Sequence, residues 1–276
     1  MHQVKLYPRD LSAMKSASTK ICAVVTYSYS MAILADQAGI DVILVGDSAA
    51  RVFSGLPDFM AVQLDQMIYH TQAVARACAH ACVMSDLPQR TMLEDPQTAV
   101  RGAELLISEG NADCVKVEGR SDQVIDLVQE IANAGIPVVG HFGMPSKITD
   151  KGGADRINPV NTRSGSEYNS QSDLVNLGRR LQEAGCCALL LSKIPSSIAA
   201  VITEVVDIPT IGIGSGAACD GQILVFEDLI GLTQREPPFY VKRYVHAGRI
   251  FSEAVESYIQ DIRELRFPEE THTRIS

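Results

Sequence analysis

The sequence has no tryptophan, few aromatic residues and no excess of positive charge. Aromatic residues make up 5% of its 276 residues, and 24 Lys and Arg against 33 Asp and Glu give a formal charge of -9. This charge opposes binding to a nucleic acid backbone. No apolar run approaches the roughly 18 residues of a membrane-spanning helix, and the first residues lack the apolar core of a signal peptide. We therefore expect neither a nucleic acid partner nor a membrane partner.

Cysteine is present, but not in the pattern of a disulfide framework. The seven cysteines are an odd number in a chain long enough to build its own apolar core. We therefore expect free thiols that pack as small apolar groups in a cytoplasmic protein. Cys78, His80 and Cys82 are spaced like metal ligands, but no second ligand pair follows at the spacing of a zinc site, so a structural zinc site is not favoured.

Short apolar runs alternate with helical patterns along the chain. The runs are apolar nearly throughout, rather than at every second residue, which suits strands buried on both faces. We predict strands at 21–26, 42–45, 81–85, 114–117, 137–141, 187–191, 210–213 and 223–226. We predict helices at 31–38, 96–109, 121–134, 170–184 and 248–266, of which the first four are each followed by a glycine.

Eight strands with helical connections in about 250 residues predict a (β/α)8 TIM barrel. The alternative is an open doubly wound sheet. The glycine-rich segment 212–216 supports that alternative only weakly, because it comes late in the chain and lacks the spacing of a dinucleotide-binding loop. We expect residues 1–276 to form a single α/β barrel domain with a C-terminal helical extension.

Polar residues stand where the predicted strands end, and in a barrel those ends form the catalytic face. From the second strand to the fifth they are Asp47, Ser48, Asp86, Lys116, Glu118 and His141. Alternation along a strand puts Lys116 and Glu118 on one face, where apolar surroundings would make either one costly without a partner. A single strand-end aspartate is often only a helix cap or turn former. Three carboxylates on neighbouring strands nevertheless favour a shared site.

These residue types suit one kind of chemistry. Three carboxylates fit a hard cation such as Mg2+, and a 2-oxo acid would supply further oxygen ligands. The metal would polarise the ketone, and Lys116 would neutralise the substrate carboxylate or an enolate oxygen. His141, taken alone, is more often a satisfied buried histidine. The pattern predicts an enzyme that acts on a small 2-oxo acid.

The segments that carry these residues resemble the ketopantoate hydroxymethyltransferase (3-methyl-2-oxobutanoate hydroxymethyltransferase) family. The matching segments are 41–48, 69–71, 85–88, 115–119, 137–141, 208–216 and 219–225, with Phe239, Lys242, Tyr244 and 267–272 in the tail. The resemblance implies a TIM barrel of the phosphoenolpyruvate/pyruvate superfamily type, cytoplasmic and Mg2+-binding, that forms a homo-oligomer, often a decamer. It implies transfer of a hydroxymethyl group from 5,10-methylenetetrahydrofolate to 2-oxoisovalerate, which gives ketopantoate for pantothenate biosynthesis.

The same resemblance assigns roles to individual positions. It implies metal ligands at Asp47, Asp86 and Glu118. It implies 2-oxo acid contacts at Asp47, Ser48, Asp86 and Lys116. His141 falls on a further active-site histidine, and Ser192 falls on the position of the catalytic base.

The sixth strand departs from this family. The family reads Leu-Glu-Cys-Val-Pro there, with the glutamate as catalytic base, whereas this chain has Ser192 and Lys193 in the middle of the motif. A serine cannot take a proton from carbon without an activating base of its own, and Lys193 would face the other way along a strand. Segments 55–63 and 154–159, and Ser28, also differ from the family pattern.

Three hypotheses remain open at this point. The first is a working transferase in which His141, a metal-bound hydroxide, or Lys116 with a pKa lowered by burial replaces the missing base. The second is a divergent Mg2+-dependent aldolase or lyase that acts on another 2-oxo acid. The third is a non-catalytic paralogue, and the retained carboxylates count against it because they are costly to keep without a ligand.

Overall fold

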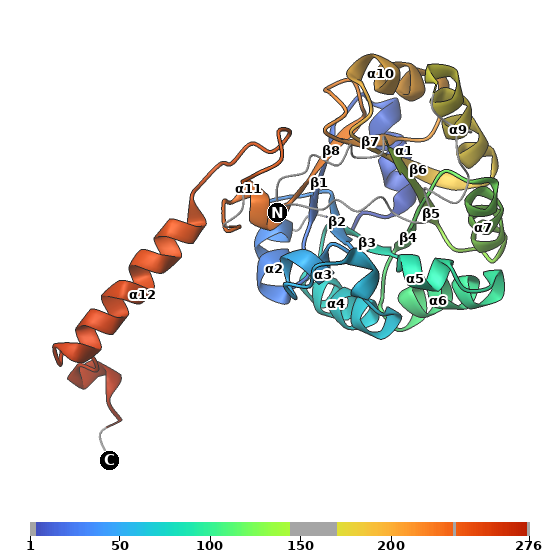
Figure 1. The fold of residues 1–276 in the computed structure, drawn as a ribbon. Helices are drawn as coiled ribbons and strands as arrows, with labels where there is room; N and C mark the ends of the chain where they lie inside the picture. Colours follow the sequence, from blue (N-terminus) through green and yellow to red (C-terminus); the bar gives the residue numbers. More distant parts are fainter. Residues whose placement is uncertain (1–3, 144–169, 234–235, 275–276) are drawn as a thin grey trace. The chain divides into compact units, whose positions relative to one another are not determined.

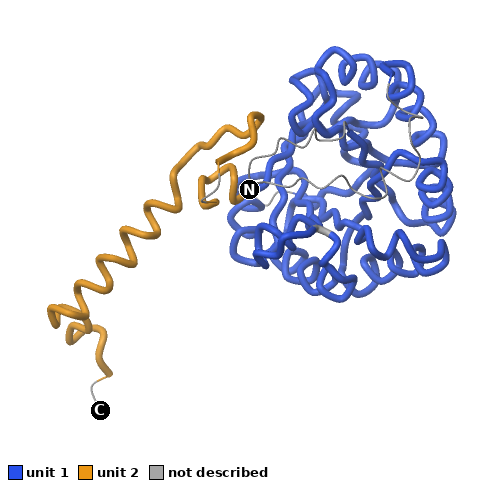
Figure 2. The backbone as a smooth tube through the Cα atoms, in the orientation of Figure 1, with its two compact units in different colours: residues 1–225 blue, residues 226–276 orange. Residues whose placement is uncertain are grey.

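The computed structural model describes residues 4–143, 170–233 and 236–274, so the divergent segment 154–159 lies outside the described residues. The chain divides into two compact units, residues 1–225 and 226–276 (Figure 2). The barrel belongs to the first unit, and the predicted C-terminal helix belongs to the second.

Eight strands close into a barrel in which every pair of neighbours is parallel (Figure 1). The strands are β1 Ile21–Val25, β2 Val42–Val45, β3 Cys82–Asp86, β4 Cys114–Glu118, β5 Val138–Gly143, β6 Cys186–Ser192, β7 Thr210–Ile213 and β8 Gly221–Val225. Their order around the barrel follows their order in the chain. The predicted TIM barrel is therefore confirmed, and the open-sheet alternative is wrong.

Helices surround the ring of strands in Figure 1. They are α1 Pro8–Ser16, α2 Tyr29–Gln37, α3 Ala49–Val52, α4 Leu64–Ala77, α5 Gln89–Met92, α6 Pro96–Ser108, α7 Asp122–Asn133, α9 Gln171–Glu183 and α10 Ser196–Val205, with a 3-10 turn η1 at Phe59–Ala61. Local capping explains where the predicted helices begin, because Asp95, Ser121 and Ser170 each accept a hydrogen bond from a backbone N–H of the first turn. The divergent Ser28 is such a cap as well, at the start of α2.

Strand register decides which side chains enter the barrel. Asp86 pairs with Lys116, and Glu118 pairs with His141. The hydroxyl of Ser85 bonds to Thr71 on α4, outside the barrel, so alternation along β3 turns Asp86 toward the interior. The charged residues at these strand ends therefore face one enclosed region, which we call the mouth.

The opposite end of the barrel, which we call the foot, is tied to the N-terminal segment. Lys15 of α1 donates hydrogen bonds to the carbonyl oxygens of Thr203, Val206 and Ile208 at 2.8, 2.9 and 3.1 Å. Its Nζ also lies 3.1 Å from Asp220, which precedes β8. These contacts hold α1 against the start of the barrel strands.

The second unit contains α11 Phe226–Leu229, α12 Ala247–Arg263 and a 3-10 turn η2 at Glu270–His272. The predicted final helix is thus confirmed, although it ends at Arg263 rather than at residue 266. Apolar side chains on α12 are exposed; they are Ile250, Phe251, Val255, Tyr258, Ile259 and Ile262. All seven cysteines are free thiols, and in the described part of the chain no helix is long and apolar enough to cross a membrane.

Candidate active site at the barrel mouth

A single ammonium group organises the mouth. Nζ of Lys116 lies 3.1 Å from Asp86 Oδ1, 3.7 Å from Glu118 Oε2 and 3.0 Å from His141 Nδ1. Lys116 is 4% exposed and Asp86 is 3% exposed, so water screens this cluster poorly. The structure thus brings together four of the residues that the strand ends singled out: Asp86, Lys116, Glu118 and His141, which we call the mouth cluster.

The imidazole of His141 has competing neighbours on one nitrogen. Its Nδ1 lies 3.0 Å from Glu118 Oε2 and 3.0 Å from Lys116 Nζ. A carboxylate only accepts hydrogen bonds and an ammonium only donates them, so Nδ1 serves one of these partners in each tautomer and opposes the other. The mouth cluster therefore has more than one hydrogen-bonding arrangement open to it.

Asp47 and Ser48 join the cluster through the loop after β2. The backbone N–H of Asp47 donates to Asp86 Oδ2 at 2.9 Å. The hydroxyls of Ser48 and Tyr27 are 2.7 Å apart. Gly46 lets the backbone of the loop lie close to the Ser48 side chain, because a Cβ at position 46 would lie 2.9 Å from Ser48 Oγ.

Burial and mutual repulsion raise the pKa values of two aspartates at the mouth. Burial raises the pKa of Asp47 well above its ordinary value, and the charges of Asp86 and Glu118 add to the shift. Burial also raises the pKa of Asp86, although Lys116 opposes the shift. The two aspartates therefore hold protons more tightly than exposed carboxyls do.

The pKa of Lys116 is shifted in the opposite direction to the one that a catalytic base requires. Burial lowers the pKa of Lys116, but the carboxylates of Asp86, Glu118 and Asp47 outweigh burial, and the net pKa is raised. A raised pKa does not favour the hypothesis that burial prepares Lys116 as the base. It favours a protonated side chain that donates hydrogen bonds.

The oxygen donors of the mouth suit a metal ion in type, but they are not gathered around one point. Asp86 Oδ1 is buried and accepts no hydrogen bond of good geometry, although Lys116 lies beside it as an ion-pair partner. Such an oxygen has coordination capacity to spare. Within the described ranges, however, no three His, Cys, Asp or Glu side chains lie close enough together to hold a metal.

Ser192 ends β6, opposite Gly143 of β5 and Ile213 of β7. A Cβ on Gly143 would collide with the Ser192 backbone oxygen, so only glycine fits there. Lys193 lies beyond the strand with a φ of 55°, a left-handed conformation that is uncommon for lysine. The strand alternation expected for Lys193 therefore does not apply, because the strand has already ended.

Four further residues near the mouth were assigned no role from the sequence. Tyr27 follows β1, His70 and Thr71 lie on α4, and Ser85 precedes Asp86. His70 Nδ1 lies 2.9 Å from the Tyr27 carbonyl oxygen, and the hydroxyls of Thr71 and Ser85 are 2.8 Å apart. The segment 69–71 matched the family pattern, but only the folded structure connects it to the strand ends.

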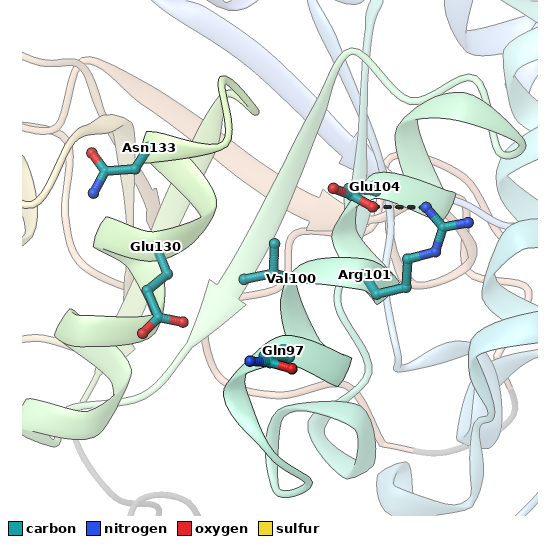
Figure 3. A pocket seen from close by; sticks show the side chains of 6 residues that line it. All are labelled: Gln97, Val100, Arg101, Glu104, Glu130 and Asn133. Carbon is teal, nitrogen blue, oxygen red and sulfur yellow. Dashed lines mark hydrogen bonds and ion pairs between the residues drawn. The ribbon is translucent and has the colours of Figure 1, made fainter.

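The structure also has a groove on the outside of the barrel, away from the mouth residues. Figure 3 shows its lining side chains on two neighbouring helices, α6 and α7. They are Gln97, Val100, Arg101, Glu104, Glu130 and Asn133, around a volume of about 370 Å³. Arg101 and Glu104 form an exposed ion pair at 2.8 Å, and this side-chain set offers no catalytic arrangement.

Comparison with known proteins places the chain in a family. A family model described as ketopantoate hydroxymethyltransferase matches residues 5–270. This chain belongs to the ketopantoate hydroxymethyltransferase family. A 3-methyl-2-oxobutanoate hydroxymethyltransferase from Prosthecochloris aestuarii is 40% identical over 95% of this chain and 94% of its own length. One from Pyrobaculum aerophilum is 42% identical over 90% and 92%. The predicted family is therefore confirmed, and so is its class, a transferase.

Solved structures confirm the type of barrel. A phosphoenolpyruvate phosphomutase from Streptomyces platensis has a TM-score of 0.61 at 13% identity, covering 94% of this chain and 88% of its own. A 2,3-dimethylmalate lyase, described as a member of the PEP mutase/isocitrate lyase superfamily, has a TM-score of 0.60 at 14% identity, covering 97% and 92%. A phosphonopyruvate hydrolase solved with oxalate and Mg2+ has a TM-score of 0.61 at 14% identity, covering 96% and 92%. At these identities the likeness concerns the fold.

Proposed function

We propose that this chain transfers a hydroxymethyl group from 5,10-methylenetetrahydrofolate to 2-oxoisovalerate, giving ketopantoate for pantothenate biosynthesis, in a Mg2+-dependent reaction. The observation that carries the proposal is the match to named transferases at about 40% identity along nearly the whole chain. The mouth cluster supports it, because it supplies carboxylates, a cation and an imidazole at the catalytic face of the barrel. The aldolase or lyase and the non-catalytic paralogue are not favoured by these relatives.

Asp47, Asp86 and Glu118 are the residues that would hold Mg2+. Carboxylate oxygens are the donors that this ion prefers. The buried Asp86 Oδ1, which has Lys116 as an ion-pair partner but no hydrogen bond of good geometry, supports a fit. When bound, the ion supplies positive charge that polarises the substrate ketone and acidifies the neighbouring C–H. The phosphonopyruvate hydrolase solved with Mg2+ shares this barrel type and so supports the choice of ion.

The chain's own residues would then bind and orient the 2-oxo acid. Lys116 remains protonated because its pKa is raised, so its ammonium group neutralises negative charge on the substrate. Ser48 and the two aspartates of the mouth would complete the contacts to the oxygens of the 2-oxo acid. Asp86 is buried, and Asp47 and Ser48 are half-buried, so less water competes for these contacts than at an exposed site.

His141 is the side chain of the mouth that we propose as the acceptor of the proton from C3. When its Nδ1–H donates to Glu118, its Nε2 carries the free lone pair and can act as a base. Ser192 occupies the base position that the resemblance implies, but as a hydroxyl it contributes at most a hydrogen bond there. Assembly into a homo-oligomer, expected as a decamer, and a cytoplasmic location belong to the same proposal.

Proton exchange at C3 of 2-oxoisovalerate in D2O, followed by NMR with and without Mg2+, tests the first half of this reaction. We expect Mg2+-dependent exchange in the wild type and only background exchange in Asp47→Ala. Asp65→Ala, which removes an exposed acid on α4, is the matched control and should behave as the wild type does. Adding 5,10-methylenetetrahydrofolate should then yield ketopantoate. Exchange without product would reject the transfer, and no exchange with Mg2+ bound would reject the enolising site.

A further inference from the structure

One short segment of α4 contacts the ends of two strands that flank β2. His70 reaches the backbone of Tyr27, just past β1, and Thr71 reaches Ser85 at the end of β3. β1 and β3 are the two neighbours of β2 in the barrel (Figure 1). Adjacent residues of one helix therefore fix the backbone on both sides of the loop that carries Asp47 and Ser48.

The contact of His70 has a defined direction. The Nδ1 atom of His70 lies 2.9 Å from the carbonyl oxygen of Tyr27. A carbonyl oxygen can only accept a hydrogen bond, so Nδ1 must carry the hydrogen. The ring is buried at 8% exposure. It also meets the edge of Phe53 at a centroid distance of 4.8 Å. Phe53 is the residue that ends α3, so His70 contacts the C-terminal end of that short helix directly.

Tyr27 transmits this support to the substrate side. Its side chain is 1% exposed, and its hydroxyl lies 2.7 Å from Ser48 Oγ. A tyrosine whose ring is buried and whose carbonyl oxygen is bonded holds its hydroxyl in place, and this hydroxyl anchors Ser48 Oγ whichever of the two donates. Ser48 is thereby prepared to contact a ligand in the mouth.

Thr71 acts in the same way on β3. Its hydroxyl donates to the carbonyl oxygen of Met67 at 2.6 Å, which uses its only proton. The hydroxyl of Ser85 must therefore donate to Thr71 Oγ1. This bond fixes the strand end at Ser85, next to Asp86, whose Oδ2 accepts the Asp47 N–H.

We infer that His70 and Thr71 are positioning residues for the 2-oxo acid site. His70 acts through Tyr27 on Ser48, and Thr71 acts through Ser85 on Asp86. Neither side chain touches the substrate. The inference rests on the proposed function, in which Ser48 and Asp86 contact the 2-oxo acid.

The barrel contains a matched control for Thr71. Thr203 of α10 donates to the carbonyl oxygen of Ala199 at 2.8 Å, and its hydroxyl lies 2.7 Å from that of Thr210. The arrangement repeats that of Thr71 with Met67 and Ser85, but Thr210 begins β7 at the foot of the barrel. Replacing either threonine by valine removes one helix-to-strand hydroxyl bond, and only one of the two bonds lies beside the mouth.

The experiment compares Thr71→Val with Thr203→Val by calorimetric titration of 2-oxoisovalerate in the presence of Mg2+, with the melting temperature measured for both. We expect similar losses of melting temperature. We expect Thr71→Val to weaken binding about fivefold, as loss of one oriented hydrogen bond would, and Thr203→Val to change it less than twofold. Thr71→Ser should restore binding. Equal effects of the two valine variants would reduce Thr71 to a structural residue.

A second pair of variants keeps the inference open to rejection if Thr71→Val does not fold. His70→Asn retains an N–H near Nδ1 and should bind 2-oxoisovalerate as the wild type does, whereas His70→Leu should weaken binding. Tyr27→Phe should weaken binding by a similar factor, and should add little to the loss in Ser48→Ala, because both act through one hydroxyl. Additive losses of binding in the Tyr27→Phe and Ser48→Ala double variant would contradict the proposed series of contacts from His70 through Tyr27 to Ser48. A wild type that binds no 2-oxoisovalerate with Mg2+ would instead overturn the proposed function, and this inference with it.

Discussion

The two ends of the barrel each enclose a lysine among oxygen atoms, and they do so in opposite ways. At the foot, Lys15 meets three neutral carbonyl oxygens and one carboxylate. At the mouth, the ammonium group of Lys116 lies among the carboxylates of Asp47, Asp86 and Glu118. The foot surrounds its lysine mainly with neutral carbonyl oxygens, whereas the mouth places three carboxylates around Lys116.

This difference separates stability from function. The contacts of Lys15 stabilise the folded state through hydrogen bonds and one ion pair. The mouth does the reverse, since burial and repulsion raise the pKa values of Asp47 and Asp86. A cluster of this kind is unfavourable until a cation or a substrate completes it, which is the usual cost of a binding site prepared in advance.

The largest expected effect comes from exchanging the two lysines for methionine. Lys116→Met should lower kcat/KM for 2-oxoisovalerate by about a thousandfold, because it removes the charge that stabilises developing negative charge. Lys15→Met should leave KM unchanged and lower the free energy of unfolding by about 3 kcal/mol, because several charged hydrogen bonds are lost. Steady-state kinetics and urea unfolding on both variants measure the split. Comparable kinetic losses in the two variants would contradict the separation of mouth and foot.

The next effect concerns the missing base. Ser192→Glu places a carboxylate at the position from which the resemblance expects proton removal, so C3 exchange should be equal to the wild type or faster, by up to about a hundredfold. Ser192→Gln has nearly the same size without a base and should give no gain. Exchange that falls in the glutamate variant but not in the glutamine variant would show that the mouth does not accept another acid.

A smaller effect should appear in the pH dependence of stability. A carboxyl whose pKa is raised in the folded state binds its proton more tightly there than in the unfolded chain. The free energy of unfolding therefore falls as pH rises from the ordinary carboxyl pKa, about 4, through the raised value. Asp47→Asn removes this loss and should be more stable than the wild type at pH 7 by about 1 kcal/mol, without Mg2+.

Urea unfolding over a pH series checks this prediction. Asp113→Asn is the control from the foot. Asp113 pairs with Lys5 at 2.7 Å and accepts the Val83 N–H, so its loss should destabilise the protein at pH 7. Parallel pH curves for the wild type and Asp47→Asn would mean that the aspartate carries no stored electrostatic free energy.

The smallest effect on stability and substrate binding is expected away from both ends of the barrel, in the groove between α6 and α7. The ion pair of Arg101 with Glu104 is exposed, so Arg101→Ala should change the free energy of unfolding by less than about 0.5 kcal/mol. KM for 2-oxoisovalerate should not change. A raised KM would place part of substrate recognition on the outside of the barrel.

The strands could be predicted well from the sequence because a strand buried on both faces is apolar throughout. Six of the predicted strands differ from the observed ones by only one or two residues at one or both ends, and 42–45 and 210–213 agree with β2 and β7. The helices α1, α4 and α10 were not predicted, and none of them is followed directly by the glycine that marked the others. Their amphipathic patterns gain meaning only against the barrel surface.

The members of the mouth cluster could be listed from strand ends, but their protonation could not. The direction of the Lys116 pKa depends on whether burial or nearby carboxylates dominate, and that depends on distances between β3 and β4. The roles of His70 and Tyr27 were equally hidden, because their contact joins residues 43 positions apart. The turn at Lys193 lacks the glycine that usually marks a positive φ.

The sequential order of the strands around the barrel has a consequence for how this site can change. Each strand delivers its functional residues through its own connecting loop, and the loop after β6 shares no backbone with those after β2, β3 and β4. Substitution at Ser192 and Lys193 can therefore proceed without disturbing the carboxylates that would hold a metal. The residues that would anchor a metal and the residues at the proton-transfer position can therefore mutate independently of one another. Evolution can change the second set while the first set is kept.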